Sequence, residues 1–180
     1  MNMKRMQILT LVAAIFSLSG FLSAGEILDI KGSFDAGLAG GFPVGWLPNK
    51  PSWWDDAATV ALNPIDGTEK QALQVTSPNQ GIHLFSGKKW PVVPGDKCVV
   101  RAMVKGSGSG QLGVYTYPGS GMFAKTFRAT EEWTQFVAEV TIPKINPLMD
   151  EEINAICVVL VANPNSSIEF LDVTAGITKP

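Results

Sequence analysis

The sequence has few residues suited to acid-base catalysis. It contains one histidine, His83, among 180 residues, and 17% of its residues are charged. A triad of nucleophile, histidine and acid would depend on this single imidazole, and no serine has the Gly-x-Ser-x-Gly surroundings of a nucleophile elbow. The 14 Lys and Arg residues nearly balance the 16 Asp and Glu residues. Because the sequence has no basic stripe, we do not expect nucleic acid as a partner.

Cysteine is scarce as well. Cys98 and Cys157 are the two cysteines, and neither belongs to a metal-type spacing such as Cys-x-x-Cys. Each lies in an apolar, strand-like run. Two interpretations stay open: the two residues form one disulfide, or both are small buried hydrophobic side chains.

A single apolar run at the N-terminus resembles a targeting segment. The positively charged start MNMKRMQ precedes the apolar run ILTLVAAIFSLSGFL, and small residues follow it. This three-part pattern is typical of a secretory signal peptide. A retained membrane anchor is the alternative, although the run is short for a bilayer. We therefore expect residues 1–24 to be a signal peptide and residues 25–180 to form one secreted, periplasmic or cell-surface domain, free of the membrane after cleavage.

The rest of the chain lacks helical periodicity. Apolar and polar residues alternate with period two between Gly, Pro, Asn and Asp residues, which is typical of β-strands. The clear candidates are residues 71–77, 81–87, 97–106, 111–117, 134–142, 154–163 and 167–177, and the weaker ones are 26–34 and 53–62. Eight or nine short strands favour an all-β fold, an antiparallel β-sandwich with jelly-roll topology.

Several motifs occur in an order that is known from one group of proteins. They are GSFDAG (32–37), GW (45–46), QALQV (71–75), VVPGDKCVVRAMVKG (92–106), EEWTQFVAEVTIP (131–143), CVVLVAN (157–163) and IEFLDVTA (168–175). In this order the sequence resembles the galactose-binding-like jelly rolls of carbohydrate-binding module families four, nine and twenty-two. The similarity covers nearly all of the chain after the signal segment. One departure is Cys98, where the family more often has an aromatic residue.

The resemblance implies a secreted, non-catalytic protein that binds a polysaccharide or oligosaccharide. A free module of this kind would gather glycans for secreted glycan-degrading enzymes, which are the implied protein partners. The resemblance also implies a structural calcium ion, because Asp35 and Asp172 match the acidic positions that serve calcium in such modules. Calcium takes several oxygen ligands, so backbone carbonyl groups would have to complete the site. The alternative is that both aspartates cap turns at the surface.

Strand phase selects the residues for a sugar-binding surface. A pyranose ring can stack on the flat ring of Trp or Tyr, which loses little rotamer entropy on binding. Leu112 and Val114 have the core phase of their strand, which puts Tyr115 and Tyr117 together on the opposite face. The same reasoning places His83 of residues 81–87 and Arg101 of residues 97–106 on the outward faces of their strands. If these strands share one sheet, their outward side chains form an aromatic and polar platform for a glycan. The alternative is that loops cover this face of the sheet. The predicted carbohydrate-binding residues are Trp53, His83, Arg101, Tyr115 and Tyr117.

The stretch SWWDD combines two tryptophans with two aspartates. If residues 53–62 form one unbroken strand, Trp54 faces the core and Trp53 faces the ligand side; a bulge would reverse this assignment. Asp55 and Asp56 are sequence neighbours and therefore do not form the facing carboxylate pair of a glycosidase. Three tryptophans are expected to be core anchors: Trp46, Trp90 and Trp133.

Two functional alternatives remain beside carbohydrate binding. The first is a structural or adhesive protein of the cell envelope, with the same fold and no glycan ligand. The second is a small glycoside hydrolase or lyase, which would need two carboxylates facing one cleft. The fold is predicted more firmly than the activity, because one fold can host many functions.

Overall fold

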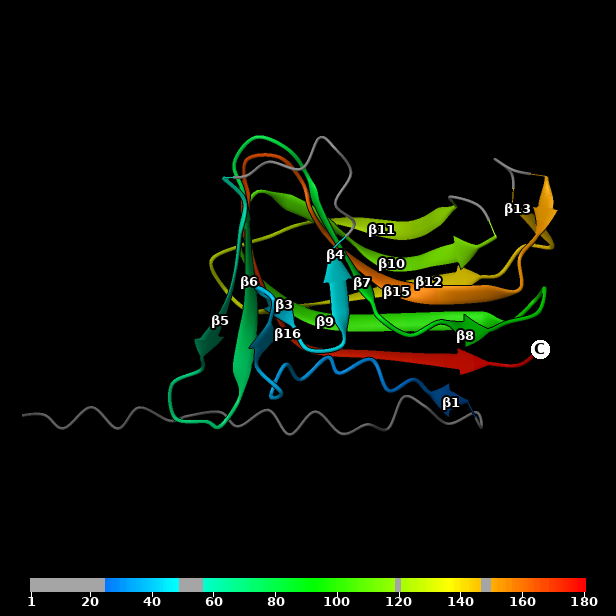
Figure 1. The fold of residues 1–180 in the computed structure, drawn as a ribbon, viewed down its shortest axis with the longest axis horizontal. Coiled ribbons are helices and arrows are strands. Elements are labelled where there is room, and N and C mark those ends of the chain that lie inside the picture. The colour runs from blue at the N-terminus through cyan, green and yellow to red at the C-terminus, as the bar shows by residue number, and fades with distance from the viewer. Residues whose placement is uncertain (1–24, 49–56, 119–120, 147–149) are drawn as a thin grey trace, which may run out of the picture.

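The computed structural model describes residues 25–48, 57–118, 121–146 and 150–180, and the regular elements in these ranges are all β-strands. Two six-stranded antiparallel sheets pack against each other around one core (Figure 1). This arrangement confirms the predicted all-β sandwich of jelly-roll type. Among the described residues, no helix has the length and apolar character needed to span a membrane.

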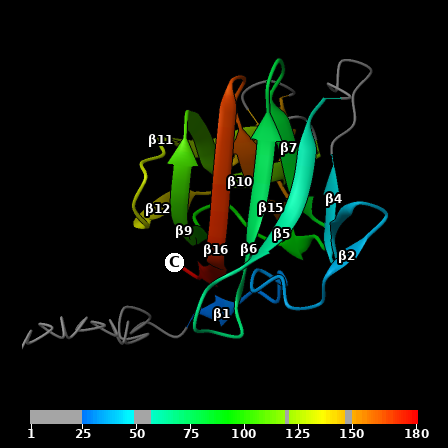
Figure 2. The same cartoon turned by 90° about the vertical axis from the view of Figure 1, so that its left-hand side faces the viewer.

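The first sheet, called sheet I, has the strand order β12-β9-β16-β6-β5, and β1 pairs with β16. Figure 2 shows β16, β6 and β5 side by side. The strands are β1 (Glu26–Ile27), β5 (Thr59–Pro64), β6 (Gln71–Ser77), β9 (Lys97–Ser107), β12 (Thr134–Thr141) and β16 (Ser166–Thr178). The first and last described strands, β1 and β16, are therefore neighbours, as expected for a jelly roll.

The second sheet, called sheet II, has the order β11-β10-β15-β7-β4, and β8 pairs with β15. Its strands are β4 (Trp46–Pro48), β7 (Ile82–Ser86), β8 (Trp90–Pro91), β10 (Ser109–Tyr117), β11 (Met122–Arg128) and β15 (Ala155–Ala162). Two small two-stranded ribbons complete the fold. They are β2 (Leu38–Ala39) with β3 (Phe42–Pro43), and β13 (Ile145–Asn146) with β14 (Glu151–Glu152).

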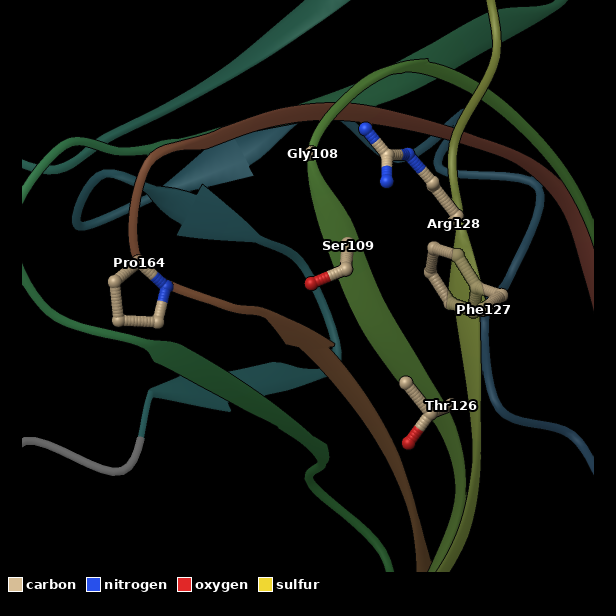
Figure 3. Close-up of a pocket in the computed structure, with 6 residues that line it drawn as sticks. All are labelled: Gly108, Ser109, Thr126, Phe127, Arg128 and Pro164. Carbon is tan, nitrogen blue, oxygen red and sulfur yellow. The ribbon is translucent and has the colours of Figure 1, made fainter.

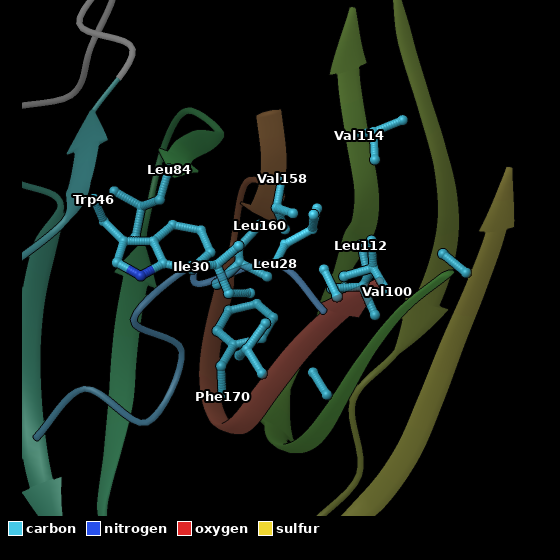
Figure 4. Close-up of a cluster of buried hydrophobic side chains, with 14 of the residues drawn as sticks. Leu28, Ile30, Trp46, Leu84, Val100, Leu112, Val114, Val158, Leu160 and Phe170 are labelled. Carbon is cyan, nitrogen blue, oxygen red and sulfur yellow. The ribbon is translucent and has the colours of Figure 1, made fainter. Parts of the chain in front are cut away.

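The core lies between the two sheets and follows the predicted strand phase. Leu112 and Val114 of sheet II are 1% and 0% exposed, and Val100 of sheet I is 0% exposed. Figure 4 shows side chains from both sheets meeting there, together with Trp46 and Phe170. Burial of such side chains is the main favourable term in folding. Trp46 and Trp90 are both buried, which confirms two of the three predicted core tryptophans.

Strand β16 changes register at a bulge between Leu171 and Thr174. Before the bulge β16 lies between β6 and β9, and after it between β1 and β9. The N-terminal segment closes on the bulge, where Val173 N–H donates to the Gly32 carbonyl oxygen over 3.1 Å. A Cβ atom on Gly32 would lie 2.0 Å from the Val173 carbonyl oxygen. Residue 32 must therefore be glycine for this close approach.

The seven clear strand predictions are confirmed, and the two weaker ones are correct in part. The segment 26–34 pairs only at Glu26–Ile27 before it turns, and the predicted strand 53–62 overlaps β5 at Thr59–Pro64. Residues 53–56 lie outside the described residues. Strand β11 was not predicted, because Lys125 interrupts its alternation at a position that shares the phase of the core residue Phe127 and of Phe123, which packs against the core. A charged residue at such a position is common on edge strands, where it discourages pairing with another chain.

Candidate functional site

Four rings form a continuous row on the outer face of sheet II. The centroids of His83 and Phe85 are 6.2 Å apart, those of Phe85 and Tyr115 are 5.1 Å apart, and those of Tyr115 and Tyr117 are 5.2 Å apart. Neighbouring rings are tilted or meet edge to face, an arrangement that aromatic pairs favour. We call these four residues the aromatic row. All four are half-buried, so each presents part of its ring at the surface.

The aromatic row is held in place by the register of three strands. Strand β15 lies between β7 and β10, where Val159 pairs with Phe85 and Cys157 pairs with Tyr115. The rings of the outer strands therefore lean over β15. This explains why Cys157 and Val159 are buried at 1% and 0% exposure although they face away from the core.

Burial changes the acid-base properties of the groups in this row. Burial lowers the pKa of His83, which favours the neutral imidazole with one N–H donor and one nitrogen acceptor. Burial also raises the pKa of Tyr117 and that of Cys157, whose hydroxyl and thiol lie 3.7 Å apart. These three groups are therefore neutral at neutral pH.

A shallow hollow of about 270 Å³ adjoins the aromatic row. Leu47 stands at one side of it and is 58% exposed. The ammonium group of Lys89 lies 3.5 Å from the centroid of the Tyr117 ring, in a cation–π contact. The hollow is lined by Leu47, Pro48, Phe85, Ser86, Gly87, Lys89, Tyr115 and Tyr117. Its lining combines ring faces, an apolar side chain and a cation, as in many ligand sites.

A second hollow, of about 460 Å³, lies on the same sheet at the other end of β10. Its lining residues are Gly108, Ser109, Thr126, Phe127, Arg128 and Pro164. Arg128 pairs with Ser109 across the β10–β11 ladder, and Figure 3 shows its guanidinium group extending toward Gly108 and Ser109. The Ser109 hydroxyl accepts a hydrogen bond from Asn163 Nδ2 over 2.9 Å.

Three of the predicted carbohydrate-binding residues come together in this site: His83, Tyr115 and Tyr117. Arg101 does not join them, because its strand β9 belongs to sheet I. The expectation that all these strands share one sheet is therefore wrong for β9. Strand phase identifies the face of a strand that points away from the core, but both sheets of a sandwich have such a face. Trp53 lies outside the described residues.

The outer face of sheet I carries a network of polar side chains, next to which lies the ring of Trp133, 5.9 Å from Lys105 Nζ. Asn63 Nδ2 donates to Glu169 Oε1 over 2.9 Å and to Gln74 Oε1 over 3.2 Å. Lys105 Nζ lies 4.0 Å from Glu169 Oε2. Hydrogen-bonding groups on this face are thus partnered by one another. Such mutual pairing leaves fewer groups for a ligand than the exposed rings of sheet II do.

The predicted calcium residues lie on two separate elements. Asp35 is exposed in a turn after Phe34, and Asp172 lies at the bulge of β16. Lys70 Nζ is 2.6 Å from Asp172 Oδ2, so an ammonium group already pairs with this carboxylate. Among the described residues, no group of three or more His, Cys, Asp or Glu side chains is arranged to hold a metal ion. Calcium at Asp35 and Asp172 therefore stays a prediction, in which backbone carbonyl groups would supply most ligands.

The two cysteines are both free thiols. Cys98 is part of the core in sheet I, and its burial raises the thiol pKa to about 12. Cys157 belongs to the outer face of sheet II, below Tyr117. Of the two interpretations left open, the structure supports the second, that of two buried hydrophobic side chains without a disulfide.

Sequence reasoning missed six of the eight residues that line the first hollow, among them Leu47, Phe85 and Lys89. Phase does place Phe85 beside His83, and its ring should have been included on that basis. Leu47 belongs to a strand of three residues, too short to show alternation. Lys89 lies in the short connection between β7 and β8, where period two carries no information.

The sequence matches no protein-family model and no curated protein. Solved structures with the same fold include the Stig cyclase FisC from Fischerella sp. TAU in complex with an indole compound. Its TM-score is 0.65 at 9% sequence identity, covering 86% of this chain and 98% of that chain.

Carbohydrate-binding modules are also among the similar structures. A CBM4 domain has a TM-score of 0.54 at 15% identity, covering 82% of this chain and 98% of that chain. The CBM22-1 xylan-binding domain from Paenibacillus barcinonensis has a TM-score of 0.54 at 15% identity, covering 87% of this chain and 97% of that chain. Identities this low show a shared jelly-roll fold and leave the activity to be argued from the site.

Proposed function

We propose that this protein binds a polysaccharide or oligosaccharide on the outer face of sheet II. The observation that carries the proposal is the aromatic row, a run of rings with centroids 5.1 to 6.2 Å apart beside an open hollow. Structural similarity to a CBM4 domain and a xylan-binding CBM22 domain supports the same class of ligand. The binding residues in this proposal are His83, Phe85, Lys89, Tyr115 and Tyr117.

The chemistry of the row suits a sugar. The C–H face of a pyranose would stack on the exposed part of Tyr115, and Leu47 would extend the apolar surface. The half-buried ring of His83 extends the row beyond Phe85 and would border the edge of the sugar. Lys89 has a flexible stem, so its ammonium group can move from Tyr117 to a ligand oxygen.

The composition of sheet II supports binding rather than glycoside hydrolysis. Its six strands contain no Asp or Glu residue. A glycosidase needs two carboxylates that face the scissile bond. Carboxylates for hydrolysis at the aromatic row would therefore have to come from segments outside these strands.

We further propose that the protein is exported and acts at the cell surface, in the periplasm or in the medium. The pattern of residues 1–24 supports this location. Secreted glycan-degrading enzymes are the partners that would benefit from a bound polysaccharide. N-terminal sequencing of the protein from its natural host tests the location, since an exported protein should begin near residue 25.

Affinity electrophoresis through gels that contain single soluble polysaccharides tests the proposed function. We expect at least one polysaccharide to retard the protein, and Tyr115→Ala to abolish most of this retardation. Tyr115→Phe keeps the ring and should bind almost as well as the natural protein. Normal migration in every gel of a broad panel, by a protein shown to be folded, would contradict the proposal and favour a structural role in the envelope.

A further inference from the structure

The two hollows on sheet II belong to one elongated face. The first hollow includes Tyr117 and the second includes Ser109, and both residues belong to β10 with the same outward phase. They are eight residues apart, which at about 3.3 Å per residue corresponds to roughly 26 Å. A ligand that uses both ends must therefore be a chain rather than a single sugar.

Arg128 provides a positive charge at the far end of this face. It is exposed, it lines the second hollow, and its guanidinium group forms no ion pair or hydrogen bond with another described residue. Glu131 and Glu132 follow it by three and four residues, yet neither pairs with it. A guanidinium group presents five N–H donors in a fork that matches an anionic oxygen group.

Lys89 provides the corresponding charge at the aromatic end. Its ammonium group lies over the Tyr117 ring and forms no ion pair within the described part of the chain. A cation beside a ring can satisfy two parts of one sugar at the same time. The ring contacts the C–H face, and the cation pairs with an acidic substituent.

Negative charge is absent from the strands between these two cations. The six strands of sheet II contain Lys125 and Arg128 and no Asp or Glu, a net charge of +2. The strands of sheet I contain four acidic residues against three basic ones, a net charge of -1; they are Glu26, Glu139, Glu169 and Asp172 against Lys97, Arg101 and Lys105. The chain as a whole has a net charge of -2, so the cationic character belongs to this face and not to the protein in general. A surface of this kind attracts anionic ligands and disfavours cationic ones.

We propose that the natural ligand is an acidic polysaccharide, whose chain lies along β10 between Lys89 and Arg128. Its acidic groups are uronate carboxylates or sulfate esters, which share the charge that the two cations recognise. This inference rests on the proposed carbohydrate binding at the same face. It adds the chemical class of the ligand and the participation of the second hollow.

Titration with defined ligands tests the proposal. The probes are long and short oligogalacturonides, their carboxyl-reduced neutral forms, and dextran sulfate, which separates carboxylate from sulfate recognition. We expect carboxyl reduction to weaken binding of the long uronate by about tenfold or more, a difference of about 1.4 kcal/mol per factor of ten. If sulfate is the natural group, dextran sulfate binds more tightly than the uronate. Binding should weaken as salt is raised from ~20 mM to ~500 mM.

Single-charge variants locate the contact. Arg128→Gln should lower the affinity for a long acidic ligand several-fold and leave the affinity for short ones unchanged. Lys89→Gln should lower the affinity for both. Lys97→Gln is the matched control, because Lys97 is an exposed cation at the start of β9 in sheet I. Lys97→Gln removes the same charge from the other side of the sandwich. It should change the affinity less than about twofold, because a distant charge acts on the ligand only through long-range attraction, which salt screens.

Three outcomes would overturn the acidic-ligand inference. They are equal affinity for the acidic and carboxyl-reduced ligands, an equal loss in the Lys97 and Arg128 variants, and equal binding of single-stranded DNA of the same charge. Retention of neutral glycans alone would overturn this inference and leave the proposed function intact. Failure of every glycan, neutral and acidic, would overturn both.

Discussion

The outer faces of the two sheets differ in how far their side chains interact with one another. On sheet I, Asn63, Gln74 and Glu169 form hydrogen bonds with one another. On sheet II, rings cover β15 while keeping part of their surface exposed, and Arg128 has no partner among the described residues. The comparison teaches that exposure alone does not mark a site. A site is marked by groups whose interactions the fold leaves incomplete.

The largest difference between the faces should appear when the central ring is removed. Phe85→Ala takes away the ring between His83 and Tyr115, so we expect glycan binding to weaken by at least about tenfold. The free energy of unfolding should fall by about 2 kcal/mol, less than for a fully buried Phe. Affinity electrophoresis and urea denaturation measure the two effects. Val137→Ala, a half-buried apolar change on sheet I, is the control and should leave binding unchanged.

The mirror experiment removes the centre of the polar network on sheet I. Glu169→Ala leaves Asn63 and Lys105 without their carboxylate, so we expect the free energy of unfolding to fall by about 1 to 2 kcal/mol. Glycan retention should stay unchanged, and Glu169→Gln should recover part of the stability because it still offers an acceptor. A clear loss of retention in either variant, with the fold intact, would show that the two faces are not functionally separate.

Strand phase explains why most of the fold could be predicted from the sequence. Alternation is strict where one face of a strand is buried, as for Leu112 and Val114, because a shift by one residue would expose the core. Strand β11 was missed because Lys125 breaks its alternation at the sheet edge. Trp133 was expected in the core, yet it is half-buried with the Lys105 ammonium group 5.9 Å from its ring. It lies directly before β12 begins at Thr134, outside the alternating run.

The site was predictable only in part, for a related reason. Phase places Tyr115 and Tyr117 on one face from local sequence alone, because both belong to β10. The grouping of β10 with β7, and its separation from β9, depends on the pairing of distant strands. The connection at Gly108 joins β9 and β10, which are neighbours in sequence but belong to different sheets. Arg101 was misplaced for this reason.

A smaller effect should appear in the pH dependence of stability. Burial lowers the pKa of His83 in the folded protein, so near its titration the unfolded chain binds more protons than the folded one. The contribution of His83 to the free energy of unfolding should therefore be complete above the ordinary histidine pKa of about 6.5. It should be lost as the pH falls below this value, through the lowered pKa of the folded protein. We expect less than about 1 kcal/mol, because the ring is half-exposed and one pKa unit corresponds to about 1.4 kcal/mol.

Urea denaturation between pH 5.5 and 7.5 measures this effect. His83→Gln should flatten the profile, because the residue that titrates in this range has been removed. An unchanged slope in His83→Gln would assign the pH dependence to other groups. A rise in stability as the pH falls would show that a nearby negative charge, and not burial, controls His83.

The smallest expected effect concerns the ion pair between Lys70 and Asp172, whose side chains are 54% and 41% exposed. Lys70→Gln should lower the free energy of unfolding by less than about 1 kcal/mol, since exposed ion pairs contribute little.

The Lys70→Gln variant also tests the calcium prediction. If Asp172 binds calcium, its carboxylate must leave Lys70, so removal of Lys70 should increase the rise in melting temperature that calcium produces. Asp35→Asn should reduce that rise. If calcium changes the melting temperature of neither the natural protein nor Lys70→Gln, the two aspartates are surface residues that cap turns and do not form a metal site.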